Sequence, residues 1–220
     1  MAAEDYLTDE EQAEALKKWF GENWLWMVAG IVLALLALAG WQRYLAYKTD
    51  RSASAAQLLE QLAASQSDEA KTNSLLKQLK DDYAATPYTD QAQLLIAQQA
   101  VQAGKFDQAA TALRSVMDSA HDEQLRLVAR VRLARVLIQQ QKADEALQLL
   151  DVSKAGAFAA QVHEVRGDAL YSKGDRTGAR AEYQSALDAA KDETGVDTSL
   201  LRLKADELSG DAPAPAVTAK

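Results

Sequence analysis

No charged side chain occurs between Glu22 and Arg43, and the 20 residues of segment 23–42 are almost wholly apolar. At about 1.5 Å per residue, a helix of this length covers roughly 30 Å, the thickness of the hydrocarbon core of a bilayer. Aromatic side chains favour the headgroup region. They flank both ends of the segment, at Trp24, Trp26, Trp41 and Tyr44. The sequence therefore predicts a transmembrane helix over 23–42, with these four rings as membrane-interface anchors.

Two alternatives to a permanent anchor are weaker. An apolar helix buried in a soluble domain does not need aromatic residues at both ends. A cleavable signal peptide has a basic start, whereas acidic residues outnumber basic ones before this span, although Ala37-Leu38-Ala39 has the small-x-small form of a cleavage site. The flanking Lys and Arg residues do not decide the orientation. A single early span followed by most of the chain is typical of a signal anchor, which predicts a cytoplasmic segment 1–22.

The composition argues against nucleic acid as a partner and against two kinds of metal site. The chain carries 24 Lys and Arg against 32 Asp and Glu, a net charge of −8. Bulk binding to nucleic acid needs a cationic surface, so nucleic acid is not an expected partner. With no Cys and only 2 His, thiolate sites are excluded and a histidine-rich metal centre is not expected.

A repeating pattern runs through the second half of the chain. Segments 97–113, 134–150 and 167–183 align so that Ala109, Ala146 and Ala179 are equivalent. Their spacing is typical of tetratricopeptide repeats, each a pair of antiparallel helices of about 34 residues. A degenerate fourth unit, with Leu75 at the alanine position, is predicted before them. The predicted fold class is all-α: a single N-terminal transmembrane helix followed by a tetratricopeptide-like helical-hairpin solenoid over 43–208.

The turns and the end of this solenoid have their own signals. Gly104 and Gly174 are expected to end the first helices of their hairpins with a positive φ, and Gln141 occupies the equivalent place in the middle unit. A capping helix over 196–208 is predicted to cover the open end of the stack. Its candidate covering residues are Leu200, Leu201, Leu203 and Leu208. The tail 209–220, rich in small residues and proline, is predicted to be disordered.

The first helices of successive hairpins line the concave surface of a solenoid, which is the usual binding surface of this fold. The alignment predicts a partner-binding groove lined by Leu94, Gln98, Val101, Val131, Arg135, Ile138, Glu164, Asp168 and Tyr171, with Gln102, Gln139 and Ser172 as further inward-facing positions. Repeats that grip a terminal carboxylate need several Lys, Arg and Asn side chains, whereas here Arg135 stands alone. The alternative that some of these side chains pack between repeats stays open.

No group of residues indicates catalysis. His121 lies in a link between helices, and His163 with Glu164 and Asp168 lacks the helical spacing of a metal site. Segment 174–178 contains two glycines, but it lies at a hairpin turn and not after a strand, so it is not a phosphate-binding loop. The sequence predicts a binding protein without catalytic, cofactor or metal sites.

Three features occur together over essentially the whole chain: the acidic lead-in from Asp9 to Phe20, the Trp-bounded span and the degenerate repeats. In this combination the chain resembles the YfgM family, the ancillary subunits of the bacterial SecYEG translocon. The resemblance implies a single-pass inner-membrane protein with a cytoplasmic N-terminus and a periplasmic helical domain. It also implies association with SecYEG, with the periplasmic chaperone PpiD and with unfolded translocated proteins, and a stress-response link through the response regulator RcsB.

Three functional hypotheses follow. The leading one is a non-enzymatic, membrane-anchored scaffold of the chaperone type at the Sec translocon, which binds a partner chaperone and newly translocated envelope proteins. The alternative is a membrane-tethered tetratricopeptide assembly scaffold for another envelope complex, for division or secretion. The third is an enzyme with an unrecognised site. Crosslinking at the anchor separates the first two.

Overall fold

The computed structural model describes residues 9–65, 68–120, 122–191 and 198–208, and all regular structure in these ranges is helical. The prediction of an all-α fold is confirmed for these residues. Internal contacts divide the chain into two units, residues 1–53 and 54–220.

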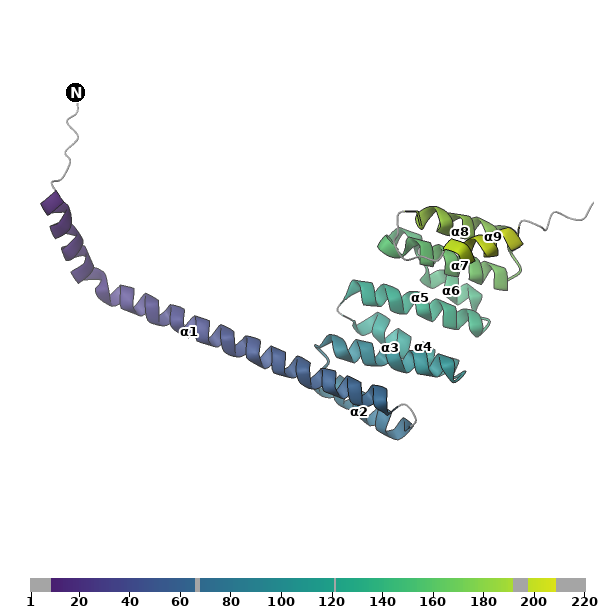
Figure 1. The fold of residues 1–220 in the computed structure, drawn as a ribbon, viewed down its shortest axis with the longest axis horizontal. Helices are drawn as coiled ribbons and strands as arrows, with labels where there is room; N and C mark the ends of the chain where they lie inside the picture. Colours follow the sequence, from purple (N-terminus) through teal and green to yellow (C-terminus); the bar gives the residue numbers. More distant parts are fainter. Residues whose placement is uncertain (1–8, 66–67, 121, 192–197, 209–220) are drawn as a thin grey trace, which may run out of the picture. The chain divides into compact units, whose positions relative to one another are not determined.

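Helix α1 runs without interruption from Asp9 to Ala64 (Figure 1). No proline occurs before Pro87, so nothing in this stretch removes a helical hydrogen bond. Every residue from Trp24 to Trp41 is exposed. Among the described residues, α1 is the one helix long and apolar enough to cross a membrane. The predicted span 23–42 therefore lies inside a longer helix, and neither of its ends is a helix end.

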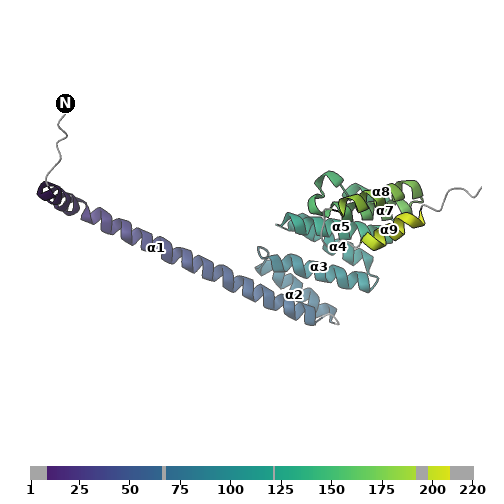
Figure 2. The same ribbon diagram turned by 45° about the horizontal axis from the view of Figure 1, so that its top comes forward.

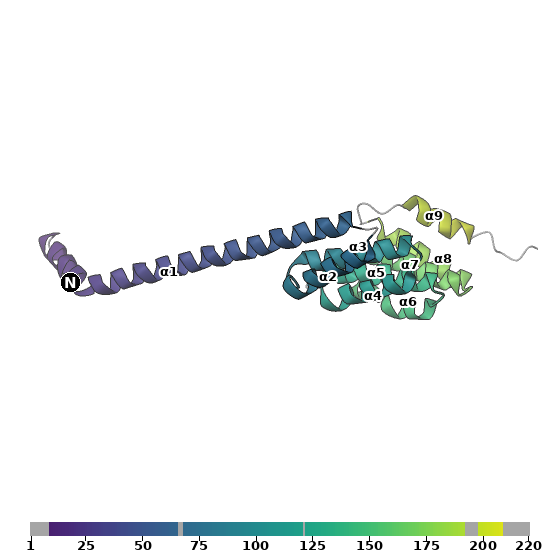
Figure 3. The ribbon, with the colours of Figure 1, turned by 90° about the horizontal axis from the view of Figure 1, so that it is seen from below.

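The second unit contains the last turns of α1 and the remaining helices, of which α3 to α8 follow one another as three hairpins (Figures 1, 2 and 3). These helices are α2 (Glu69–Asp82), α3 (Pro87–Gln102), α4 (Phe106–Ser119), α5 (Glu123–Gln139), α6 (Ala143–Leu149), α7 (Ala159–Ser172), α8 (Arg176–Ala189) and α9 (Thr198–Glu207). Two short 3₁₀ helices, Val152–Lys154 and Gly156–Phe158, join α6 to α7. Contacts link α3 with α4, α5 with α6 and α7 with α8, which confirms the three predicted hairpins.

Small residues set the packing within each hairpin. The three equivalent alanines, one on each second helix, are all fully buried: Ala109, Ala146 and Ala179. Four residues after each of these alanines, a larger side chain is buried: Leu113, Leu150 and Tyr183. The sequence repeat therefore marks the inner face of the second helix of each hairpin. There the small alanine side chain lets the two helices approach closely, and the larger residue four positions later fills the core.

The end of α1 and helix α2 occupy the place predicted for a degenerate fourth unit. Leu75 is buried there, and one core cluster joins residues of α1, α2 and α3. Its buried members are Ala55, Leu62, Leu75, Leu79, Ala92 and Ile96. The helix that carries the apolar segment thus ends as the first helix of the packed unit.

Each hairpin turn needs one residue with left-handed backbone. Gly104 and Gly174 have φ of 71° and 84°, as predicted, and Gln141 adopts a φ of 62° at the equivalent place. Residues other than glycine rarely adopt this backbone conformation. The turn geometry is therefore conserved between hairpins even where the residue type is not.

The predicted capping helix is present as α9, but two of its four leucines are exposed. Leu201, Ala205 and Leu208 are buried against α8, because i, i+4 and i+7 positions share one face of a helix. Leu200 and Leu203 are 48% and 66% exposed, so the prediction that they cover the stack is wrong. The predictions for His121 and for the tail 209–220 lie outside the described residues.

Candidate functional site

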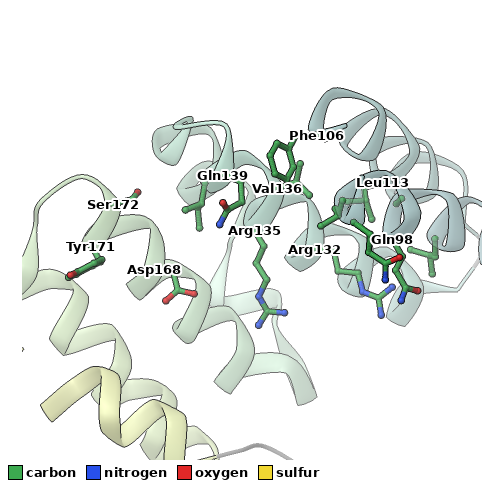
Figure 4. A pocket seen from close by; sticks show the side chains of 15 residues that line it. Gln98, Phe106, Leu113, Arg132, Arg135, Val136, Gln139, Asp168, Tyr171 and Ser172 are labelled. Carbon is green, nitrogen blue, oxygen red and sulfur yellow. The ribbon is translucent and has the colours of Figure 1, made fainter. Parts of the chain in front are cut away.

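A groove of about 950 Å³ opens between α3, α5 and α7 (Figure 4). Seven of the nine residues predicted for the binding surface line it: Leu94, Gln98, Val101, Arg135, Ile138, Asp168 and Tyr171. The three further inward-facing positions, Gln102, Gln139 and Ser172, line it as well. The first helices of three successive hairpins thus supply the groove, in agreement with the helical alignment.

Two predicted groove residues lie elsewhere. Val131 is 4% exposed and belongs to the hydrophobic core, which is the packing alternative left open by the sequence. Its neighbour Arg132 lines the groove instead, since successive side chains on a helix point about 100° apart. Glu164 does not line the groove but forms ion pairs beside it.

The alignment also missed several lining residues: Ala97, Phe106, Leu113, Arg132 and Val136. Phe106 and Leu113 belong to α4, a second helix, which was not expected to reach the concave surface. On α5, Arg132, Arg135, Val136 and Gln139 follow the i, i+3, i+4, i+7 spacing of one helix face. Testing that spacing against each possible face of α5 could have found Arg132 and Val136.

Tyr171 provides an accessible aromatic surface at the α7 side of the groove (Figure 4). Its side chain is 43% exposed. The guanidinium carbon of Arg176 lies 5.7 Å from the ring centroid, within range of a cation–π contact. Val101, on α3, is 41% exposed. The groove therefore presents apolar contact area to solvent from two hairpins.

A network of ion pairs crosses from α5 to α9 beside the groove. Arg135 donates a hydrogen bond of 3.1 Å to Glu164. Lys204 of α9 donates to both Glu164 and Asp168, each at 2.8 Å. The hydroxyl of Tyr183 donates to the same oxygen of Asp168 at 2.8 Å. Two cations and two carboxylates balance, and the network ties the capping helix to α7.

This environment shifts two pKa values. Burial lowers the pKa of Lys204, but its hydrogen bonds to Asp168 and Glu164 outweigh that effect and leave the pKa raised. Burial raises the pKa of Tyr183 strongly, and the nearby negative charge of Asp168 adds to the shift. Both groups therefore keep their protons throughout the neutral range, and the network is in its bonded form.

Arg132 differs from the other charged groups of the groove. It is exposed and lines the groove, and the described residues offer its guanidinium neither an ion pair nor a hydrogen bond. The charges of Arg135 and Asp168, in contrast, are compensated within the network described above. Arg132 is thus a cation in the groove that none of its described neighbours neutralises.

A second polar cluster lies between α7 and α8 and explains His163. Its Nδ1 is 2.6 Å from a carboxylate oxygen of Glu182, whose other oxygen accepts a 2.8 Å hydrogen bond from Arg166. Arg166 also donates to the carbonyl of Leu150 at 2.9 Å. These contacts join α7 to α8 and to the end of α6. Within the described ranges, no three His, Asp or Glu side chains gather in a way that could hold a metal ion.

The first unit offers a different surface, the exposed apolar side of α1. The four predicted interface anchors are all exposed: Trp24, Trp26, Trp41 and Tyr44. The rings of Trp41 and Tyr44 lie 6.1 Å apart, and Tyr47 accepts a 2.6 Å hydrogen bond from Arg51 in the next turn. Aromatic rings therefore stand at both ends of the apolar segment.

One exposed apolar helix and a helical-hairpin solenoid with a groove define a membrane-anchored protein of the tetratricopeptide repeat class. The model of the tetratricopeptide repeat-like domain family matches residues 17–210. A protein of Escherichia coli named "Ancillary SecYEG translocon subunit" is 35% identical over 209 residues, which cover 94% of this chain and 99% of the relative. The chain belongs to the family of these ancillary subunits.

More distant relatives with the same name come from other bacteria. The protein of Neisseria gonorrhoeae is 27% identical over 206 residues, 92% of this chain and 98% of the relative. That of Haemophilus influenzae is 26% identical over 181 residues, 82% of this chain and 89% of the relative. No solved structure matches the chain significantly.

Proposed function

We propose that this chain is a non-enzymatic, single-pass membrane subunit that associates with the SecYEG translocon. One observation carries the proposal: the similarity to the E. coli protein of that name extends over 94% of this chain and so includes both the apolar helix and the solenoid. The exposed apolar surface of α1 supports a contact in the plane of the membrane, since none of the residues in its most apolar stretch is buried.

The proposed topology has residues 1–22 in the cytoplasm and the solenoid in the periplasm, anchored in the bacterial inner membrane. The position of the apolar segment ahead of the packed unit supports this orientation. Protease added to spheroplasts should then digest the solenoid and leave a short, membrane-protected fragment. Protection of the whole chain would reverse the assignment. N-terminal sequencing of the membrane-bound protein tests the anchor itself, because a chain that begins near Gly40 would mean that the segment is cleaved.

The solenoid is proposed to act in the manner of a chaperone, with unfolded translocated proteins and the periplasmic chaperone PpiD as its partners. The groove supports this role because it combines exposed apolar side chains with amide and charged groups. Such a surface can contact both the side chains and the main chain of an extended polypeptide.

The translocon contact can be tested by crosslinking from the membrane helix. A photoreactive amino acid is placed at Leu33 or Leu36, which are exposed on α1, and at Glu207 on the solenoid as a control. A SecYEG component should be the main product from the two α1 positions and not from Glu207. A division or secretion protein in its place would favour the alternative scaffold function and contradict the proposal.

The groove is tested by Tyr171→Ala, with Leu203→Ala as a matched control. Both side chains are exposed, but only Tyr171 lines the groove. Truncating an anchor residue costs about 1–3 kcal/mol of binding free energy, so crosslinking to a translocating chain should fall in the first variant alone. Equal thermal stability of the two variants shows that the loss is not due to unfolding. Unchanged binding would mean that the partner surface lies elsewhere.

A further inference from the structure

The groove contains positively charged side chains although the chain as a whole is acidic. The net charge of the chain is −8, yet helix α5 contains four arginines and one acidic residue, Glu123. Two of these arginines, Arg132 and Arg135, line the groove, and their side chains extend from α5 in the same direction (Figure 4). The groove is therefore a local cationic site on an acidic protein.

Among the described residues that line the groove, Arg132 alone offers a ligand a charge without an ion pair. Arg135 is engaged by Glu164 at 3.1 Å, and the adjoining carboxylate of Asp168 is engaged by Lys204 and Tyr183. An unpaired guanidinium beside apolar walls favours a carboxylate, which can accept two parallel hydrogen bonds from it.

The groups around Arg132 indicate the rest of the ligand. The exposed amides of Gln98 and Gln139 line the same groove and can both donate to and accept from a peptide main chain. Val101, Phe106 and Ile138 supply apolar contact area. A membrane surface or a nucleic acid would need a broad cationic patch, which a single unpaired arginine does not provide.

We infer that the groove selects extended polypeptide segments in which an Asp or Glu side chain lies close to apolar residues, and that Arg132 determines this preference. The inference rests on the proposed function of the groove and names the class of segment it takes. Apolar contacts hold the segment, and the charge of Arg132 discriminates among segments of equal hydrophobicity.

Three labelled peptides test the inference, each about 12 residues long with identical apolar residues and a central pair of Asp, Asn or Lys. Binding to the full-length chain in nanodiscs is measured by fluorescence anisotropy. The Asp peptide should bind about three- to fivefold more tightly than the Asn peptide, the range of one exposed ion pair, and the Lys peptide more weakly. Raising the ionic strength from about 0.05 M to about 0.5 M should remove most of this difference.

Arg132→Gln should make the Asp and Asn peptides equivalent without changing the affinity for the Asn peptide. Arg132→Glu should reverse the order, so that the Lys peptide binds best. Arg130→Gln is the matched control, because Arg130 belongs to the same helix but does not line the groove. It should leave the preference for the Asp peptide intact.

The outcomes separate this inference from the proposed function of the groove. If all three peptides bind equally and Arg132→Gln has no effect, the charge preference is refuted while the groove still binds peptides. If Arg130→Gln abolishes the preference as fully as Arg132→Gln does, the attraction is diffuse and the inference also fails. If none of the peptides binds, both the inference and the role of the groove are refuted.

Discussion

Gly167 is the position where one added methyl group should disturb the solenoid most. It is buried on α7, and a Cβ built there would lie 2.5 Å from Cε1 and 2.6 Å from Cδ1 of Tyr183. Ordinary contact begins at 3.4 Å, so the ring would have to retreat by about 0.9 Å. The ring cannot move freely, because it is almost fully buried and its hydroxyl is bonded to Asp168 at 2.8 Å.

The net effect of Gly167→Ala is the difference of two opposing contributions. Overpacking of a core typically costs about 1–3 kcal/mol. Alanine stabilises a helix interior relative to glycine by about 0.8–1.0 kcal/mol. The overlap of about 0.9 Å with a buried and hydrogen-bonded ring places the overpacking cost in the upper part of its range, at about 2–3 kcal/mol. We therefore expect a net destabilisation of about 1–2 kcal/mol. For a unit of this size, that lowers the melting temperature by about 2–8 °C.

The assay is thermal unfolding of the full chain followed by circular dichroism, with a second background as the control. In a Tyr183→Leu variant the ring is absent, so adding Gly167→Ala should be neutral or stabilising by about 1 kcal/mol. A change of sign between the two backgrounds assigns the effect to the ring contact. A melting temperature that stays constant or rises when Gly167→Ala is made in the native sequence would refute the reasoning.

Three further predictions concern the turns, the core and the dependence on pH. Gln141→Gly should raise the melting temperature by about 2–4 °C, because glycine adopts a φ of 62° without strain and the variant gains about 1 kcal/mol of stability. A melting temperature below that of the native sequence would contradict this prediction. Val131→Ala should cost about 1–3 kcal/mol in chemical denaturation because the side chain is buried, and an unchanged midpoint would show that the site tolerates the loss. The pKa values of Lys204 and Tyr183 are raised in the folded state. Their contribution to the free energy of unfolding is therefore complete below about pH 10, near their pKa values in the unfolded chain, and is lost as the pH rises further. A pH titration of stability should show this alkaline decline, and Lys204→Met should make it shallower; an equal slope in both proteins would contradict the assignment.

Local sequence signals located most of the helical architecture. The equivalent alanines predicted the buried faces of α4, α6 and α8, because a repeat in sequence becomes a repeat in packing. Gly104 and Gly174 predicted the left-handed turns. The uncharged segment predicted a helix long and apolar enough to span a membrane without any knowledge of its neighbours, since length and composition alone set that property.

The groove could be predicted only as a set of helix faces. Seven of the nine chosen residues line the groove. The alignment exchanged Val131 for Arg132, whose side chain points about 100° away on the same helix. Similarly, Leu200 and Leu203 were taken as covering residues although the buried face of α9 contains Leu201. A periodic pattern says which residues share a face, and the neighbouring helices decide which face turns inward.

The sequence by itself determined the helices, the turns between them and the apolar segment, because these depend on interactions within a few residues of chain. The C-terminal end of helix α1 and the polar network depend on tertiary contacts. Helix α1 continues to Ala64 because its last turns pack against α2 and α3, and Lys204 bonds to Glu164 and Asp168 from 40 and 36 residues away. Only tertiary structure brings such groups together, since a charge on one helix has no local signal for its partner on another.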